Sequence, residues 1–202
     1  MPVKIAVGNL KGGTAKTTSA VFVALGLARQ GRTLLVDADP QQSAFDWSTL
    51  AGDNWPSQLT VIPWATRDLA KRAKEVAADY DHLIIDTGPE DAAILRQALL
   101  ITEHLLIPVG PSPMELRRLG RTLDLATEVD ALSPVYPRVL LTRLRAGTRS
   151  STEAREILNE MEVPMLEVGI RRLEMYSLAM GSVPEDLGEY SAVLSELEAE
   201  LS

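Results

Sequence analysis

The sequence predicts an α/β fold, with a mostly parallel, twisted sheet and helices on both of its faces. Short runs rich in Leu and β-branched residues recur along the chain, turn residues bound each run, and helical patterns separate most of them. This alternation is typical of parallel sheets that are covered on both faces. The chain has 202 residues, of which 46% are hydrophobic, enough for one large core, so we expect a single domain over residues 1–202.

Seven of the runs are predicted strands, and four helical patterns lie between or after them. The predicted strands are residues 3–7, 33–36, 59–63, 82–85, 104–109, 135–141 and 163–168. The predicted helices are residues 17–31, 66–80, 90–102 and 112–130. Gly31 is expected to close the first helix. In the last one, Ser112, Pro113 and Glu115 match a capping box with proline in the first turn.

The segment NLKGGTAKTTSA, residues 9–20, lies where the first predicted strand gives way to the first predicted helix. A glycine-rich turn at this place lets backbone N–H groups and the positive end of the helix face an anion. Lys16 can then reach the outer phosphates of a nucleotide, and the hydroxyl of Thr17 can ligate Mg²⁺. The ordinary pattern G-x-x-x-x-G-K-[ST] is not met, because Leu10 and Ala15 occupy its glycine positions. A glycine turn with both lysines in solvent is the alternative.

The segment does match the variant K-G-G-x-x-K-[ST], which runs from Lys11 to Thr17. With this motif the sequence resembles the ParA/MinD family of deviant Walker A ATPases, and within it the short ParA-type partition proteins without an N-terminal DNA-binding domain. The resemblance implies a P-loop NTPase fold with ATP and Mg²⁺ as cofactors. The nucleotide-binding residues that it implies are Gly12, Gly13, Thr14, Ala15, Lys16, Thr17 and Thr18. Family members usually have glycine where Ala15 stands, and alanine fits there where φ is negative.

Two further segments place aspartates at the carboxyl ends of predicted strands. LLVDADPQQS carries Asp37 and Asp39, and HLIIDTGP carries Asp86. The carboxyl ends of parallel strands meet at one edge of the sheet, where ligands bind in open α/β folds. The resemblance implies that Asp39 positions the attacking water and that Asp86 holds Mg²⁺, usually through water. Each aspartate taken alone would be interpreted as the cap of a turn.

Phosphoryl transfer spreads negative charge over the phosphate oxygens, so the site needs cations placed in advance. Mg²⁺ on Thr17 and the ammonium of Lys16 supply two of them, and Lys11 is the candidate for a third. In the family this signature lysine crosses to the nucleotide of a facing subunit, which implies an ATP-dependent homodimer that hydrolysis releases. The expected catalytic residues are Lys11, Lys16 and Asp39. A solvated loop lysine is the alternative for Lys11.

Basic residues are concentrated in one stretch of an acidic chain whose net charge is −8. Residues 138–150 carry four arginines and no acid, whereas residues 174–202 carry seven acids and no base. Non-specific DNA binding needs only several contacts to phosphates. The candidate DNA contacts are Arg143, Arg145, Arg149, Arg171 and Arg172. Either Arg171 or Arg172 matches the DNA-contacting arginine of the family, and ordinary surface arginines are the alternative.

We therefore expect a cytoplasmic, nucleoid-associated ATPase, weak alone and stimulated by DNA and a partner. Its expected role is to segregate a plasmid or chromosome with a centromere-binding ParB-like protein. The alternatives are a ParA-like ATPase that positions a protein cargo on the nucleoid, and a metabolic ATP-dependent synthetase of the same fold. A non-catalytic adaptor is disfavoured by the complete set of motif residues.

The composition of the chain excludes several other classes of protein. The chain has no cysteine, which excludes iron–sulfur relatives with cysteine ligands. Neither a signal peptide nor an apolar run of about 18 residues is present, so no membrane partner is expected. A MinD-like membrane helix would be basic, but the C-terminal segment EDLGEYSAVLSELEAELS is acidic and would be repelled by anionic lipid.

Overall fold

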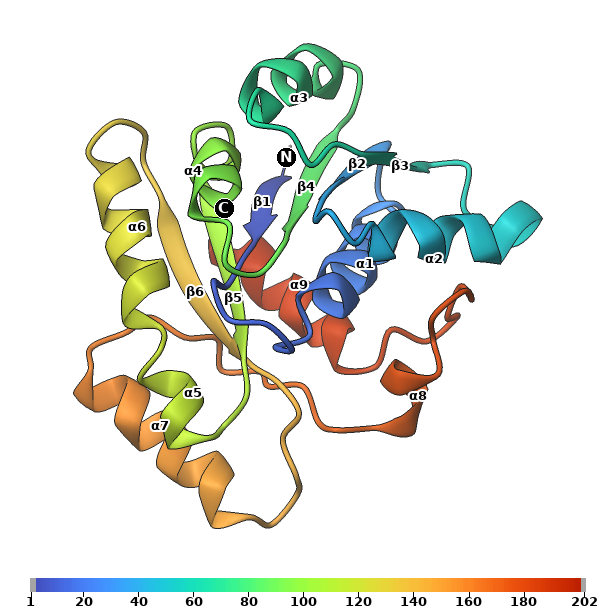
Figure 1. Cartoon of the computed structure of the whole chain (residues 1–202). Coiled ribbons are helices and arrows are strands. Elements are labelled where there is room, and N and C mark those ends of the chain that lie inside the picture. The colour runs from blue at the N-terminus through green and yellow to red at the C-terminus, as the bar shows by residue number, and fades with distance from the viewer. Residues whose placement is uncertain (1–2, 201–202) are drawn as a thin grey trace.

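A computed structural model describes residues 3–200 and confirms the predicted α/β fold class (Figure 1). The described residues form a sheet of six parallel strands in the order β3-β2-β4-β1-β5-β6. The strands are β1 (Val3–Val7), β2 (Thr33–Ala38), β3 (Leu59–Pro63), β4 (His82–Thr87), β5 (His104–Val109) and β6 (Tyr136–Leu141). The interior strands β2 and β4 are buried along their whole length, which explains the apolar runs LLV and LII in their sequences.

Helices cover both faces of the sheet. One face carries α3 (Leu69–Ala77), α4 (Ala92–Leu99), α5 (Pro113–Leu116), α6 (Gly120–Asp130) and α7 (Arg149–Glu160). The other carries α1 (Lys16–Leu27), α2 (Ser43–Ala51) and α9 (Glu189–Glu200), with the 3-10 helix η1 (Gly52–Asn54) after α2 and the short α8 (Glu174–Ser177) before α9. Each face therefore has its own apolar core, and both cores share the sheet between them.

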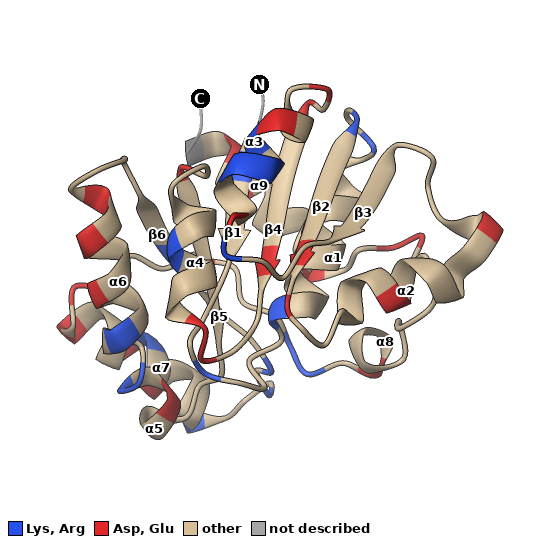
Figure 2. Ribbon diagram, turned by 45° about the horizontal axis from the view of Figure 1, so that its top comes forward, with Lys and Arg blue, Asp and Glu red and all other residues tan. Residues whose placement is uncertain are grey.

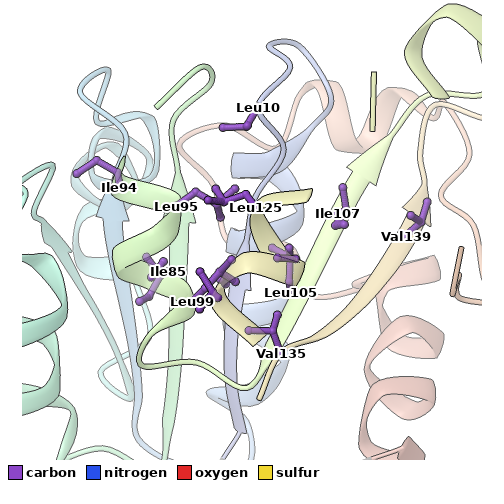
Figure 3. Packing of buried hydrophobic residues seen from close by; sticks show 14 of the residues in the cluster. Leu10, Ile85, Ile94, Leu95, Leu99, Leu105, Ile107, Leu125, Val135 and Val139 are labelled. Atoms are coloured by element: carbon purple, nitrogen blue, oxygen red, sulfur yellow. The ribbon is translucent and has the colours of Figure 1, made fainter. Parts of the chain in front are cut away.

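Figure 3 shows how the first of these cores is built. Leu95 and Leu99 of α4 point toward Leu105 of β5, and Leu125 of α6 meets them from the side. All of these side chains are at most 5% exposed. Burying side chains of this size stabilises the fold by about 1.5–3 kcal/mol each, before conformational entropy is counted.

The strand order brings three carboxyl ends together. β4 lies between β2 and β1, and Asp86 of β4 is in register with Asp37 of β2 and Val7 of β1. β2 and β4 both run two residues further than the sequence predicted, so both aspartates belong to the strands themselves. The loops that follow these three strands therefore meet at one edge of the sheet.

The predicted seventh strand, residues 163–168, is wrong. This segment runs beside β6 but makes only an isolated bridge between Met165 and Val139. The backbone N–H of Val139 donates to the carbonyl of Pro164 at 2.9 Å, and that of Leu166 donates to the carbonyl of Val139 at 2.9 Å. Pro164 has no N–H to donate, which prevents a continuous ladder at this place.

The single helix predicted over residues 112–130 is also wrong, because α5 and α6 are separate. Between them the N–H groups of Arg118 and Leu119 donate to the carbonyls three residues earlier, the tighter pattern of a 3-10 turn. The capping box is wrong as well, because the side chain of Ser112 makes no cap hydrogen bond. Glu115 instead accepts the N–H of Gly110 at 3.1 Å and turns toward the site described next.

Candidate active site

The loop between β1 and α1 is held in place by a buried asparagine. The side-chain amide of Asn9 donates to the carbonyl of Pro108 at 3.0 Å, and its oxygen accepts the N–H of Lys11 at 2.9 Å. The N–H of Leu10 donates to the hydroxyl of Thr122 at 3.2 Å. These bonds fix the start of the loop to β5 and α6. Asn9 was not among the predicted site residues, although a polar residue that follows an apolar strand so closely was a signal for it.

The end of the loop turns sharply into α1. Gly13 and Ala15 both have left-handed backbones, with φ of 69° and 70°. An L-residue in this conformation costs roughly 1–2 kcal/mol, whereas glycine does not. Ala15 therefore stands where the backbone favours glycine, and the negative φ at which alanine fits without strain is not met.

Lys16 begins α1 and its side chain turns back over the loop. It is 6% exposed, and its Nζ donates to the carbonyl of Lys11 at 3.0 Å. Burial lowers the pKa of Lys16, while the nearby carboxylates of Asp86 and Asp39 act in the opposite direction. The alternative in which this lysine lies in solvent is therefore wrong for Lys16. The Lys16 ammonium therefore joins the two ends of the loop from Lys11 to Lys16. This arrangement is expected where backbone N–H groups surround a phosphate.

Asp86 lies at the floor of the site and is fully buried. Neither of its carboxylate oxygens has a hydrogen-bond partner among the described residues. Burial raises the pKa of Asp86 to about 8, and the neighbouring Thr17 hydroxyl and Lys16 ammonium lower it. A buried carboxylate beside a hydroxyl, with two oxygens free, suits a hard cation such as Mg²⁺. The residues present therefore fit the metal that the sequence predicts.

The two aspartates of the second strand have different surroundings. Asp37 is fully buried, and its oxygens accept the N–H groups of Asp39 at 3.1 Å and Phe45 at 2.9 Å, so it holds the turn into α2. Burial raises the pKa of Asp37, and these backbone hydrogen bonds oppose the shift. Asp39 accepts the N–H of Gln41 at 2.9 Å and is 9% exposed.

Asp39 borders an open depression of about 320 Å³ that is also lined by Pro40, Pro89 and Glu90. A Cβ placed on Gly88 would lie 3.2 Å from the Asp39 carboxyl, so a glycine there leaves room for this side chain. Of the two aspartates, Asp39 is the one that borders open space, as a residue that orients water requires.

Lys11 lies on the rim of the loop and makes contacts within its own chain. Its Nζ donates to the carbonyl of Gly12 at 3.3 Å and lies 3.6 Å from a carboxylate oxygen of Glu115. The same oxygen accepts from the Arg143 guanidinium at 2.6 Å. Glu115 thus connects Lys11 to Arg143. The predicted capping box gave Glu115 a different role, at the start of a helix. An adjacent depression of about 430 Å³ is lined by Lys11, Glu90, Arg118 and Arg121, among others.

A third hollow, a cavity of about 160 Å³, lies at the other end of the loop. Ala15 and Thr18 form one wall, and the segment before α9, including Tyr176, forms the other. Tyr190 lies at its base, where its hydroxyl is 2.9 Å from that of Ser19 in α1. Sequence patterns did not predict this cavity, because its two walls are about 150 residues apart in the chain.

The arginines predicted to contact DNA come from two segments that lie side by side. Leu144 and Arg171 form an isolated parallel bridge, and the N–H of Arg172 donates to the carbonyl of Leu144 at 2.7 Å. Arg143 is turned toward Glu115 and Arg171 is paired with Glu189. Arg145 and Arg172 are exposed, and Arg149 is exposed with a contact to Glu153 at 3.2 Å. Contact of these five arginines with DNA stays a prediction.

Comparisons with known proteins show what the whole chain is similar to. Residues 3–60 match a family model described as an AAA domain. The chain is 30% identical over 178 residues to maintenance of carboxysome distribution protein A from Halothiobacillus neapolitanus, covering 87% of this chain and 82% of that protein. It is 26% identical over 211 residues to protein ParA from Rhizobium radiobacter, covering 98% and 94%.

Among solved structures, an ATP complex of McdA from Cyanothece is similar to this chain with a TM-score of 0.81. The match covers 97% of this chain and 96% of that one. At 20% sequence identity, this match shows that the two chains share a fold and shows nothing about function. In the part of the chain that the structure describes, no helix is both long and apolar enough to span a bilayer.

Proposed function

The chain belongs to the ParA-type family of deviant Walker A ATPases, and on that premise we propose that it positions a protein assembly through ATP-dependent dimerisation on DNA. ATP and Mg²⁺ are its cofactors. A relative named for carboxysome distribution covers most of the chain at 30% identity. A protein cargo, one alternative from the sequence, is therefore better supported than segregation of a plasmid or chromosome with a centromere-binding ParB-like protein.

The observation that carries the ATPase proposal is the buried pair of Lys16 and Asp86. A lysine whose Nζ caps the loop carbonyl, beside a buried carboxylate with free oxygens, has the two charges that a nucleotide triphosphate with its metal requires. The loop N–H groups and Lys16 hold the outer phosphates. Thr17 and Asp86 would hold Mg²⁺, which when bound supplies positive charge to the phosphate oxygens.

In this proposal Asp39 orients the attacking water, because it borders open space on the loop side of β4. Part of the nucleoside enters the 160 Å³ cavity between Thr18 and Tyr176, which continues from the phosphate loop at Ala15. The cavity is wide enough for part of a nucleoside and has an aromatic wall on which a base can stack.

Lys11 has to leave Glu115 to reach the nucleotide of a facing subunit. The distance of 3.6 Å is long for an ion pair, and the same oxygen of Glu115 accepts from Arg143 at 2.6 Å, so Glu115 keeps a cationic partner when Lys11 leaves. The contact of Lys11 with Glu115 is therefore easily exchanged for a shared γ-phosphate. The dimer would also double the number of exposed arginines such as Arg145 and Arg172, so ATP would raise DNA affinity through avidity.

The test is Lys11→Ala, with Lys71→Ala on the exposed side of α3 as the matched control. We expect Lys11→Ala to retain nucleotide binding but to lose ATP-dependent dimerisation in light scattering and to lose turnover stimulated by DNA and partner. The control should behave as the parent. Unchanged dimerisation and turnover in Lys11→Ala would remove the cross-subunit role, and turnover that responds only to a small molecule would favour a synthetase.

A further inference from the structure

Thr142 directly follows β6 and carries a buried hydroxyl that reaches the phosphate loop. The residue is 1% exposed, and β5 separates its strand from β1 in the sheet. The hydroxyl nevertheless lies 3.2 Å from the carbonyl of Thr14, in the loop that follows β1. A buried polar side chain therefore joins the end of one strand to the loop of another.

The Thr142 hydroxyl has two carbonyls within reach but only one proton to donate. The carbonyl of Val109 also lies 3.2 Å away, and it already accepts the backbone N–H of Thr142 at 2.7 Å. Among the described residues, no other group donates to the carbonyl of Thr14. A carbonyl without a donor is costly in a buried place, so the hydroxyl proton belongs to the bond with Thr14.

This bond fixes the direction of the next N–H group in the loop. The peptide bond between Thr14 and Ala15 is trans, so the carbonyl of Thr14 and the N–H of Ala15 point in opposite directions across one planar unit. The carbonyl is held toward Thr142, and the N–H is turned away from it. Within residues 3–200 this N–H has no hydrogen-bond acceptor. It is a free donor of the kind that binds a phosphate oxygen.

Ala15 needs such a restraint, because its backbone is strained. Its φ of 70° lies in the left-handed region, which alanine rarely adopts. Strained conformations persist where the surrounding structure over-determines them. The bond from Thr142 acts on the peptide unit directly before this angle, so it is placed to keep Ala15 in the left-handed form.

Charge does not explain the place of Thr142. Figure 2 shows acidic residues near the carboxyl ends of β2 and β4 and a basic residue at the start of α1. Those residues supply the charges of the site, whereas the threonine hydroxyl is neutral. An effect of Thr142 on nucleotide binding must therefore come from the geometry of the loop.

We propose that Thr142 is a positioning residue for phosphate, a role that rests on the proposed function because it needs ATP to bind at this loop. The hydroxyl holds the carbonyl of Thr14 and thereby keeps the N–H of Ala15 turned toward the phosphate. Part of the phosphate affinity thus depends on a residue 128 positions from Thr14 in the chain.

The test compares two buried threonines. Thr142→Val removes the hydroxyl at nearly constant shape. Thr102→Val is the matched control, because Thr102 is also 1% exposed and its hydroxyl donates to the carbonyl of Ala98 at 3.0 Å, at the amino edge of the sheet. Binding of a non-hydrolysable ATP analogue with Mg²⁺ is measured by calorimetry. We expect Thr142→Val to weaken binding by about tenfold or more, and Thr102→Val and Thr142→Ser to bind as the parent does.

Inorganic triphosphate separates two ways in which Thr142 can act, since the residue also lines the 160 Å³ cavity. If it acts through the loop, Thr142→Val should weaken binding of triphosphate with Mg²⁺ by the same factor as binding of the ATP analogue. A loss confined to the analogue would mean that Thr142 contacts the nucleoside instead, and it would overturn the proposal.

Ala15→Gly tests the link to backbone strain. Glycine adopts the left-handed form without strain, so Thr142→Val should cost less nucleotide affinity in the Ala15→Gly background than in the parent. Equal losses in the two backgrounds would mean that the bond does not act on Ala15, which also contradicts the proposal.

A last measurement needs no change at Thr142 and remains available if Thr142→Val fails to fold. In the parent, the amide proton of Ala15 should exchange rapidly with solvent and become protected when Mg²⁺ and triphosphate bind. Protection elsewhere in the loop without protection at Ala15 would overturn the role of Thr142.

The outcomes distinguish this role from the proposed function. A parent that binds neither the ATP analogue nor triphosphate would overturn both. A parent that binds both ligands, with equal affinity in Thr142→Val, would overturn the role of Thr142 alone.

Discussion

The two edges of the sheet differ in how completely their polar groups are satisfied. At the amino edge, the N–H of Val3 donates to Nδ1 of His82 at 3.3 Å and the hydroxyl of Thr33 donates to the carbonyl of Gly31 at 3.1 Å. At the carboxyl edge, Thr14 and Asp86 have buried side-chain oxygens without a hydrogen-bond partner among residues 3–200.

Backbone conformation shows the same difference. Among the described residues, five residues other than glycine have positive φ, and four of them follow strands at the carboxyl edge: Ala15, Gln42, Glu90 and Arg143. Strain and unsatisfied groups of this kind cost of order 1–3 kcal/mol each and persist where a ligand compensates for them. One edge of the sheet is therefore built for stability and the other for binding.

The largest effect should follow from Asp39→Ala, which removes a carboxylate from the carboxyl edge. We expect ATP hydrolysis to fall about a hundredfold while the ATP-bound dimer persists, because the variant lacks the group that orients water. Single-turnover hydrolysis and light scattering measure the two outcomes, with Asp124→Ala on α6 as the control. Rapid hydrolysis by Asp39→Ala would move this role to another residue.

Asp86→Asn, at the same edge, should have opposite effects on two quantities. It should stabilise the metal-free fold but weaken Mg²⁺-dependent nucleotide binding. The folded-state pKa of Asp86 is raised to about 8, whereas the unfolded pKa is about 3.9, so its buried carboxylate destabilises the metal-free fold increasingly from pH 4 to pH 8. In EDTA at pH 9 the variant should be more stable than the parent by roughly 1–3 kcal/mol, and the gain should vanish near pH 4.

The same variant should lose Mg²⁺-dependent nucleotide binding, since the amide carries no charge. Denaturation at the two pH values and nucleotide titration with and without Mg²⁺ measure these effects. A variant that is less stable at pH 9 and binds Mg²⁺–ATP normally would contradict both expectations.

His82→Gln tests whether a histidine at the amino edge of the sheet is held neutral in the folded protein. Burial lowers the pKa of His82, so the folded protein prefers neutral imidazole, and its contribution to stability is lost as the pH falls below the unfolded value of about 6.5. The variant keeps an acceptor for the N–H of Val3. Between pH 7.5 and 5.5 it should lose about 1 kcal/mol less unfolding free energy than the parent, measured by urea denaturation, with hydrolysis at pH 7.5 unchanged. Equal losses would mean that His82 is not held neutral.

The smallest effect should follow from Ala15→Gly, which relieves a left-handed alanine. Glycine adopts φ near 70° without strain, so the variant should gain about 0.5–1 kcal/mol in thermal denaturation. Ala131→Gly is the control, because this exposed alanine after α6 has φ of −63° and gains nothing from glycine. Equal shifts in the two variants would show that the loop stores no strain at Ala15.

Local patterns in the chain predicted much of the carboxyl edge. The loop at residues 11–17, the six observed strands and the positions of Asp37, Asp39 and Asp86 all follow from motif spacing and apolar runs. The seventh predicted strand, residues 163–168, failed because Pro164 interrupts the ladder beside β6. The long helix over residues 112–130 failed because its apolar spacing continues across the 3-10 turn before Gly120, and a single glycine does not by itself end a helical pattern.

The sequence by itself determined that an anion-binding loop joins an apolar strand to a helix, because backbone hydrogen bonding and side-chain periodicity act between near neighbours. Only the tertiary structure decided which distant side chains complete the edge: Glu115 meets Arg143 across 28 residues, and Tyr190 meets Ser19 across 171. Such partners depend on strand order and on which helix covers which face, and those are set by packing of the whole core rather than by any short segment.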